Sequence, residues 1–219
     1  MKEKRNYSSE IRDSKALKTR SQILRAAKQL FQNQGFDRVT IGMLAKAAGV
    51  SMPTIYALFK SKRGVLQSLI DDALPVEQFT ELVDNSMNEQ SPRKCLSITA
   101  KLSRQIYDAE RELIDILRGA SVVAPELREL EQEREQRRYE RQGEYVKKLM
   151  QSKALSKGLT IQKARDILWS LTGRDMYRML VIERAWSSDA YEKWLGKVLI
   201  ESLLNIDKIK GDIKDKETF

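Results

Sequence analysis

The side chains best suited to chemistry in this sequence are hydroxyls and amines that gather between Thr40 and Lys62. They donate hydrogen bonds and phosphate oxygens accept them, so this set of donors suits a nucleic-acid backbone. The chain has no histidine, which removes the commonest general base, and we find no glycine-rich loop of the P-loop or Rossmann type. A small helical enzyme is therefore the weaker alternative, and we predict neither a cofactor nor a metal site.

The pattern around these donors predicts two short helices joined by a tight turn. Apolar residues recur at helical spacing after Thr40, Gly49 breaks the pattern, and Val50 supplies one apolar residue in the turn. Ser51 can cap a second helix, whose apolar residues are Ile55, Leu58 and Phe59. Two capped helices around a glycine turn are typical of a helix-turn-helix, with an ordinary helical hairpin as the alternative.

A helix-turn-helix places the start of its second helix in the major groove. On that geometry the residues facing base edges are Met52, Pro53 and Thr54, and the phosphate contacts are Thr40, Ser51, Tyr56, Lys60 and Lys62. No Arg, Asn or Gln lies in the readable part of this helix, so bidentate purine contacts are missing. We expect much of the affinity to come from backbone charge and DNA shape. A half-buried core role for Tyr56 and solvated lysines remain alternatives.

The net charge is concentrated around this motif. Residues 1–63 hold 14 Lys and Arg against 4 Asp and Glu, a net charge of +10, whereas the other residues hold 26 against 27, a net charge of −1. A basic segment joined to a near-neutral one indicates a surface for a phosphate backbone. A membrane-surface helix is less suitable, because this segment uses its apolar residues for a core.

Composition predicts an all-α protein of one or two domains. The 219 residues include only 4 Pro and 10 Gly, and apolar residues recur at helical spacing almost throughout. We find no apolar stretch of about 20 residues and no apolar segment of a secretory signal, so we predict no membrane partner. The single cysteine, Cys95, cannot form an internal disulfide, which fits the reducing cytoplasm. The expected location is therefore cytoplasmic.

We divide the chain into four parts. Residues 1–13 form a flexible basic arm, with a disordered tail as the alternative, and residues 208–219 form a C-terminal tail. Residues 14–62 form the helix-turn-helix DNA-binding domain, and residues 63–207 form a helical domain. Within that domain, residues 124–141 hold 11 charged residues of mixed sign among 18, which indicates a long solvated helix rather than a coiled coil.

The fixed spacing of many residues resembles the N-terminal signature of the TetR/AcrR family of transcriptional regulators. The matching residues are Gly35-Phe36, Thr40-Ile41, Leu44-Ala45, Ala48-Gly49-Val50-Ser51, Thr54-Ile55-Tyr56, Phe59, Lys62 and Leu66. The resemblance implies a three-helix DNA-binding domain, a larger ligand-binding and dimerisation domain, and repression relieved by a small molecule. It supports Thr40, Tyr56 and Lys62 as phosphate contacts. The chain departs from the family at Met52, where members often carry a small or basic residue.

Two further groups of residues are candidates for this larger domain. Apolar and aromatic residues that could line a pocket for a small-molecule effector, or belong to the core, are Phe79, Tyr107, Ile116, Trp169, Met176 and Tyr177. Helices predicted over residues 160–185 and 187–206 have broad apolar faces, which suit a four-helix interface between two copies. The candidates for that interface are Leu171, Leu180, Trp194, Val198, Leu199 and Leu203.

The resulting hypothesis is a homodimeric, ligand-responsive repressor that binds a palindromic operator in double-stranded DNA. A dimer would present two recognition helices roughly 34–36 Å apart, in successive major grooves. The alternative is a helical protein–protein adaptor that binds DNA only non-specifically and docks partners on the charged helix.

Overall fold

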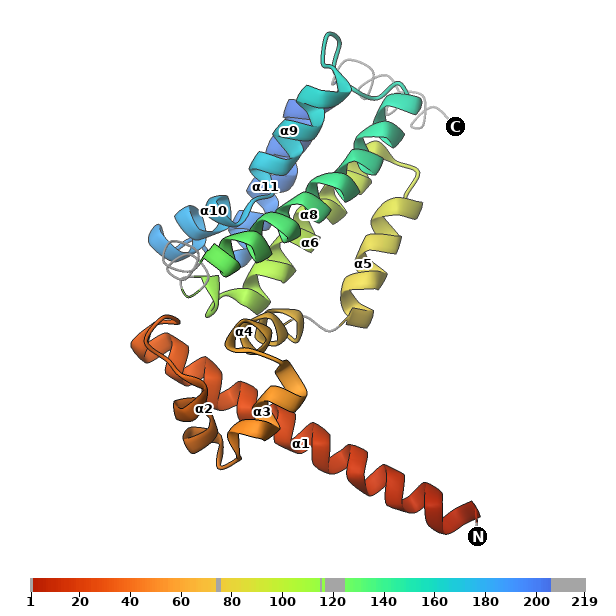
Figure 1. Cartoon of the computed structure of the whole chain (residues 1–219). Helices are drawn as coiled ribbons and strands as arrows, with labels where there is room; N and C mark the ends of the chain where they lie inside the picture. Colours follow the sequence, from red (N-terminus) through yellow and green to blue (C-terminus); the bar gives the residue numbers. More distant parts are fainter. Residues whose placement is uncertain (1, 74–75, 115, 117–124, 206–219) are drawn as a thin grey trace. The chain divides into compact units, whose positions relative to one another are not determined.

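A computed structural model of the whole chain describes residues 2–73, 76–114, 116 and 125–205 (Figure 1). The chain forms two compact units: the first comprises Met1–Ala73 and Glu112–Glu129, and the second comprises Leu74–Arg111 and Leu130–Phe219. The described residues are mostly helical and contain no β-strand, only one isolated bridge between Leu155 and Leu204. The predicted all-α class is therefore confirmed.

The first unit contains four helices: α1 (Lys2–Gln34), α2 (Ile41–Ala48), α3 (Met52–Phe59) and α4 (Lys62–Asp71). Helix α1 packs against α2 and α4, and α3 packs against both α2 and α4. The buried side chains of this core are Ile23, Ala27, Phe31, Phe36, Val39, Leu44, Ile55, Phe59, Val65 and Leu66. Since each helix contributes to one apolar core, the short helices α2 and α3 are held by tertiary packing rather than by their own helix propensity.

Two predicted boundaries differ from the structure in this unit. Helix α1 begins at Lys2, so the segment predicted as a flexible arm is helical from that residue; it contains no Gly or Pro to interrupt a helix. Helix α4, which we assigned to the second domain, lies in the first unit. Its apolar face explains this, because Val65, Leu66, Leu69 and Ile70 are all buried.

The second unit contains α5 (Val76–Asn88), α6 (Pro92–Glu110), α9 (Ile161–Leu171), α10 (Arg174–Tyr177), the π-helix η1 (Arg178–Glu183) and α11 (Ser188–Leu203). Helix α8 (Pro125–Gln151) contributes its residues from Leu130 onward. Helix α11 packs against α6 and α9, and α5 packs against α6 (Figure 1). Gly196 lies where α11 meets α6, and a Cβ there would make an ordinary contact, 3.7 Å from the Cβ of Ala100.

The single helix predicted over residues 160–185 is wrong: the structure divides it into α9, α10 and η1. The break falls at Thr172 and Gly173, where Gly173 takes an extended conformation and starts α10. The hydroxyl of Thr172 donates to the carbonyl of Leu168 at 2.6 Å and accepts from Arg138 and Gln142 of α8. These bonds anchor the end of α9 on α8. By contrast, α11 begins at a regular cap, since Ser187 accepts from the amide of Ala190 at 3.1 Å.

Candidate functional site

Helices α2 and α3 form a capped helix–turn–helix with a bend of 105° between them. Thr40 caps α2 by accepting from the amide of Met43 at 3.2 Å, and Ser51 caps α3 by accepting from the amide of Thr54 at 3.3 Å. Gly49 ends α2 in the left-handed region at φ 66°, which glycine adopts without a steric cost. Both helix N-termini therefore present backbone N–H groups beside an exposed hydroxyl residue, which is an arrangement that suits anions.

One face of α3 is open to solvent although its side chains are apolar. Met52 is 51% exposed and Tyr56 is 50% exposed, while Ile55 and Phe59 on the opposite face are buried. Leu58, which we expected in the core, is 39% exposed. In α3, Ile55 and Phe59 thus pack inside the domain, whereas the side chains of the other large apolar residues are exposed to solvent. Tyr56 consequently lies on the surface rather than in the core.

The other predicted DNA contacts in and just after α3 differ in their exposure and in the hydrogen bonds that they already form. Pro53 is exposed, and Thr54 is half-buried with its hydroxyl 2.8 Å from the Ser51 hydroxyl. These two hydroxyls therefore bond each other as well as capping the helix. Lys60 is exposed, and its Nζ lies 3.4 Å from the carbonyl of Ala57 in its own helix.

Lys62 does not extend into solvent as a phosphate contact requires. Its ammonium donates to the carbonyls of Phe36 and Val39 at 2.8 Å each and to that of Asp37 at 3.3 Å. The same nitrogen lies 4.3 Å from the centre of the Phe36 ring. We therefore correct the predicted role of Lys62, because its ammonium donates to these carbonyls rather than extending toward a phosphate.

Sequence reasoning missed Gly64, although it decides how α4 meets α3. A Cβ at this position would lie 1.9 Å from the carbonyl oxygen of Phe59, which no side chain could accept without a backbone shift. Ser61 caps α4 directly before it, accepting from the Gly64 amide at 3.0 Å. At the other end of α4, Asp72 forms a two-pronged ion pair with Arg20 of α1. Both ends of α4 are thus fixed inside the first unit.

Comparison with known proteins identifies this architecture. The family described as "Bacterial regulatory proteins, tetR family" matches residues 23–69, which cover the C-terminal third of α1, all of α2 and α3, and most of α4. The chain matches the TetR family over this segment. Its alignment with an uncharacterised HTH-type transcriptional regulator, YdgC of Bacillus subtilis, is 29% identical and covers 47% of this chain and 54% of the relative. The chain therefore matches little more than half the length of this curated relative.

Solved structures extend the likeness of the fold to the second unit. NalD, the secondary repressor of the MexAB-OprM multidrug efflux pump in Pseudomonas aeruginosa, matches with a TM-score of 0.68 at 22% identity, over 87% of this chain and 98% of NalD. FadR from Bacillus subtilis, solved with stearoyl-CoA, matches with a TM-score of 0.67 at 18% identity, over 82% of this chain and 97% of FadR. The likeness of fold thus covers both units, with a helix-turn-helix unit followed by a helical one.

In the second unit, two predicted pocket residues are core residues. Tyr107 and Tyr177 are buried with their ring centroids 5.7 Å apart, and Tyr191 packs on Tyr177 at 5.3 Å. The Tyr107 hydroxyl donates to the carbonyl of Thr172 at 3.1 Å, and the Tyr177 hydroxyl donates to Asp108 at 2.6 Å. Burial and the bond to Asp108 raise the pKa of Tyr177 to about 12.

The other pocket candidates are not gathered at one place. Phe79, Trp169 and Met176 are half-buried, with Arg141 stacked over Phe79 and Arg138 over Trp169. Ile116 is buried but belongs to the first unit. The predicted set therefore divides into core tyrosines, ring–guanidinium contacts and one residue elsewhere.

Helix α8 carries a charged layer into the second unit, contrary to the prediction of a solvated helix. Arg134 pairs with Glu110 of α6 at 2.5 Å, and Glu110 is only 4% exposed. Glu131 pairs with Arg174 of α10 at 2.5 Å. Arg138 pairs with Glu135 at 2.5 Å. Mixed charge at helical spacing identified the helix, but it could not show that one of its faces is covered.

Polar atoms without a protein partner lie beside this layer. Within the described residues, the Tyr191 hydroxyl and Oε1 of Gln142 are buried and form no hydrogen bond. Gln142 bonds Thr172 through its Nε2 at 2.7 Å, as Arg138 does at 3.0 Å. Burial raises the pKa of Tyr191, which keeps this phenol neutral. Sequence reasoning missed both residues, because neither stands out from an ordinary helical pattern.

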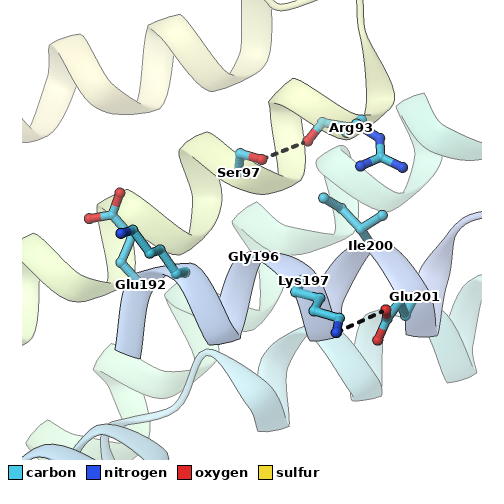
Figure 2. Close-up of a pocket in the computed structure, with 8 residues that line it drawn as sticks. Arg93, Ser97, Glu192, Gly196, Lys197, Ile200 and Glu201 are labelled. Carbon is cyan, nitrogen blue, oxygen red and sulfur yellow. Dashed lines mark hydrogen bonds and ion pairs between the residues drawn. The ribbon is translucent and has the colours of Figure 1, made fainter. Parts of the chain in front are cut away.

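A surface groove of about 560 Å³ runs between α6 and α11 (Figure 2). The residues that line it are mostly of charged or polar types, although their apolar parts contribute much of its surface: Arg93, Ser97, Glu192, Lys193, Gly196, Lys197, Ile200 and Glu201. Lys197 and Glu201 face each other along α11 with 3.8 Å between Nζ and Oε1. None of the predicted pocket residues lines this groove.

The predicted dimer residues also separate into two classes. Leu199 and Leu203 are fully buried within their own chain, where α11 packs on α6 and α9, so their assignment to the interface is wrong. Leu171, Leu180, Trp194 and Val198 are half-buried and keep part of their apolar surface accessible. The apolar surface predicted for the interface thus includes residues packed inside their own chain and residues that stay partly accessible to solvent.

Two further observations bear on the predicted partners. Across the described ranges, no single helix is long and apolar enough to cross a membrane, and only the bent pair α2 and α3 passes by length and composition when joined. In the same ranges, His, Cys, Asp and Glu form no group of three that could hold a metal ion.

Proposed function

We propose that this chain is a transcriptional repressor that binds a palindromic operator as a homodimer and is released by a small molecule. The observation that carries the proposal is the solvent-open face of α3, on the basic part of the chain that also holds the capped N-termini of α2 and α3. The match of residues 23–69 to the TetR family supports this proposal. NalD, which resembles it in fold, is a repressor.

On this proposal α3 enters the major groove with Met52, Pro53 and Thr54 nearest the bases. Met52 and Pro53 offer apolar contact to thymine methyl groups, and phosphates lie against the N-termini of α2 and α3 at Thr40 and Ser51. Tyr56 and Lys60, both exposed, reach the flanking phosphates. Sequence choice then depends on two half-sites and on DNA shape more than on bidentate contacts.

The proposed dimer forms through the accessible edges of α9, η1 and α11. The supporting residues are Leu171, Leu180, Trp194 and Val198, which leave apolar surface accessible on one chain. An interface of this kind is the same patch on both subunits, and it sets the spacing of the two recognition helices.

The proposed effector binds near the charged layer of α8, beside Tyr191 and Gln142. Their unpartnered atoms offer an acceptor and a phenol in an apolar, aromatic surrounding. Because Arg134, Arg138 and Arg174 are already paired with glutamates, we expect a ligand whose buried part is uncharged. FadR, a neighbour in fold, carries a ligand with a long acyl chain in its stearoyl-CoA complex.

The test is binding of the full-length protein to a labelled DNA fragment from beside its own gene, followed by fluorescence anisotropy. The competitor is the same fragment with one half of its palindrome scrambled. The repressor proposal expects retention of the intact fragment at about 0.15 M salt and release of the scrambled one, with a steep dependence on salt.

The adaptor alternative gives a different result. It expects equal binding to intact and scrambled fragments, and loss of both at moderate salt. Sedimentation of the free protein tests the proposed dimer separately. A monomer that still prefers the palindrome would contradict the proposed interface but would leave repression possible.

A further inference from the structure

The inference concerns Lys62 and the link that connects α1 to α2. Gly35 ends α1 in the left-handed region at φ 80°, and residues 35–40 then lead to Thr40, the N-cap of α2. Carbonyl groups in such a link have no helical partner and need donors from elsewhere. Phe36, Asp37 and Val39 find the same donor, because their carbonyl oxygens converge on Nζ of Lys62.

The lysine and the link fix each other from both sides. Phe36 and Val39 are buried, so their carbonyls are held by the core on either side of the ammonium. The ring of Phe36 lies 4.3 Å from Nζ, where its negative face attracts the cation. Lys62 itself is the first residue of α4 and follows the Ser61 cap directly. One side chain thus joins the start of α4 to the residues that immediately precede α2.

We propose that Lys62 is a positioning residue for the DNA interface: it sets the N-terminus of α2, and through Thr40 it sets the phosphate contact made there. The proposal rests on the DNA-binding function proposed above, and it replaces a direct phosphate contact by Lys62. Val39 accepts from Lys62 and is the neighbour of Thr40 in the chain, so a shift of this link moves the cap directly.

Three variants of the full-length protein separate positioning from contact. Lys62→Met keeps the length of the side chain and removes all three bonds. Lys62→Arg keeps the charge, and thus a phosphate contact, but a planar guanidinium fork cannot serve three convergent carbonyls as a compact ammonium does. Lys60→Met is the matched control, because Lys60 is exposed and bonds only a carbonyl of its own helix.

Hydrogen exchange without DNA tests the clamp independently of any DNA-binding function. The reporter is the amide of Met43, which donates to the Thr40 hydroxyl. We expect its exchange to accelerate about tenfold or more in Lys62→Met and Lys62→Arg and to stay unchanged in Lys60→Met. Unchanged exchange in both Lys62 variants would overturn the proposal, even if the protein bound DNA normally. Faster exchange in a protein that bound no DNA would remove the proposed function and leave the clamp.

DNA affinity as a function of salt tests the second half of the proposal. Positioning predicts that Lys62→Met and Lys62→Arg weaken binding by about tenfold with the salt slope unchanged, whereas loss of a phosphate contact lowers the slope by about 0.9. A slope lowered by that amount in Lys62→Met and kept in Lys62→Arg would show direct contact and overturn positioning. Lys60→Met is expected to lower the slope.

A double-mutant cycle with Thr40→Ala distinguishes positioning from a general loss of stability. If Lys62 acts through Thr40, the tenfold effect of Lys62→Met shrinks to less than about twofold in the Thr40→Ala background. Additive losses in the two backgrounds would mean that Lys62 merely stabilises the fold, and they would overturn its role at the DNA.

Discussion

The two units of this chain place their polar groups in opposite ways. In the first unit, polar side chains hold helix ends near the surface: Thr40, Ser51 and Ser61 cap three successive helices, and Lys62 holds the link before α2. In the second unit, polar groups also lie inside, where Arg134 meets the buried carboxylate of Glu110. The first arrangement fixes a rigid surface that a partner can contact, and the second keeps polarity within a helical interior.

This difference matches the two tasks in the proposed function. Caps cost little to maintain, since each satisfies an otherwise unpaired backbone amide at the surface. Buried charge pairs are costly to desolvate and contribute little net stability, so their retention points to a different use. We infer that the charged layer of α8 serves the effector, while the caps of α2 and α3 serve the DNA.

The largest expected effect comes from breaking the charged layer. Arg134→Met leaves the carboxylate of Glu110 buried without its partner, which is expected to reduce the free energy of unfolding by about 3–5 kcal/mol. The comparison is Lys28→Met in the first unit, which removes an exposed pair with Glu112 and should cost about 1 kcal/mol or less.

Urea unfolding distinguishes these outcomes cleanly. All 3 tryptophans, at positions 169, 186 and 194, lie in the second unit, so their fluorescence reports on that unit. Circular dichroism follows the whole chain for Lys28→Met. Equal small losses in both variants would mean that the two units do not differ as described. The double variant Arg134→Met with Glu110→Leu should recover most of the loss, because no charge then stays buried alone.

The next effect concerns close packing in the first unit. Gly64→Ala places a Cβ 1.9 Å from the Phe59 carbonyl oxygen, so the start of α4 must move away from α3. We expect a loss of about 3 kcal/mol, at the upper end for overpacking. Gly42→Ala in α2 is the matched control, because its nearest neighbours would lie 3.8 Å away. It should stabilise the helix by up to about 1 kcal/mol.

Hydrogen exchange of amides in α3 and α4 measures both glycine variants, because the first unit has no tryptophan. Exchange in Gly64→Ala should accelerate across both helices. Wild-type protection in that variant would show that the contact between α3 and α4 yields easily, and that the surface of α3 is less rigid than the caps indicate.

How far the sequence predicts these features depends on the distance between partners. The caps were predictable, since Thr40 and Met43 or Ser51 and Thr54 are three residues apart and the pattern is local. The Lys62 clamp spans 23 to 26 residues and was not predictable, so a family resemblance suggested a phosphate contact instead. The burial of Leu199 was missed for a related reason: periodicity identifies an apolar face but not which helix covers it.

A smaller effect tests the aromatic core through pH. Tyr177→Phe removes the hydrogen bond to the Asp108 carboxylate, so we expect a loss of about 2 kcal/mol at pH 8. The pKa of Tyr177 is raised to about 12 in the folded chain, above its ordinary value near 10. The unfolded chain therefore releases this proton first, and the stability of the wild type falls as pH rises from about 10 to 12.

Urea unfolding at pH 8, 10 and 11.5 compares the two proteins. The difference between wild type and Tyr177→Phe should shrink as pH rises, because the phenylalanine variant lacks this titration. A difference that stays constant up to pH 11.5 would show that Tyr177 is not held in its neutral form by Asp108.

The smallest expected effect has the opposite sign and links the interior to the effector. Tyr191→Phe deletes a buried hydroxyl that has no partner among the described residues. An unsatisfied buried hydroxyl is costly, so its removal should raise the free energy of unfolding by up to about 1 kcal/mol. The control is Tyr107→Phe, whose hydroxyl donates to the Thr172 carbonyl, and which should lose about 1 kcal/mol instead. Tryptophan fluorescence in urea measures both, and a destabilised Tyr191→Phe would mean that this hydroxyl already has a partner and does not wait for an effector.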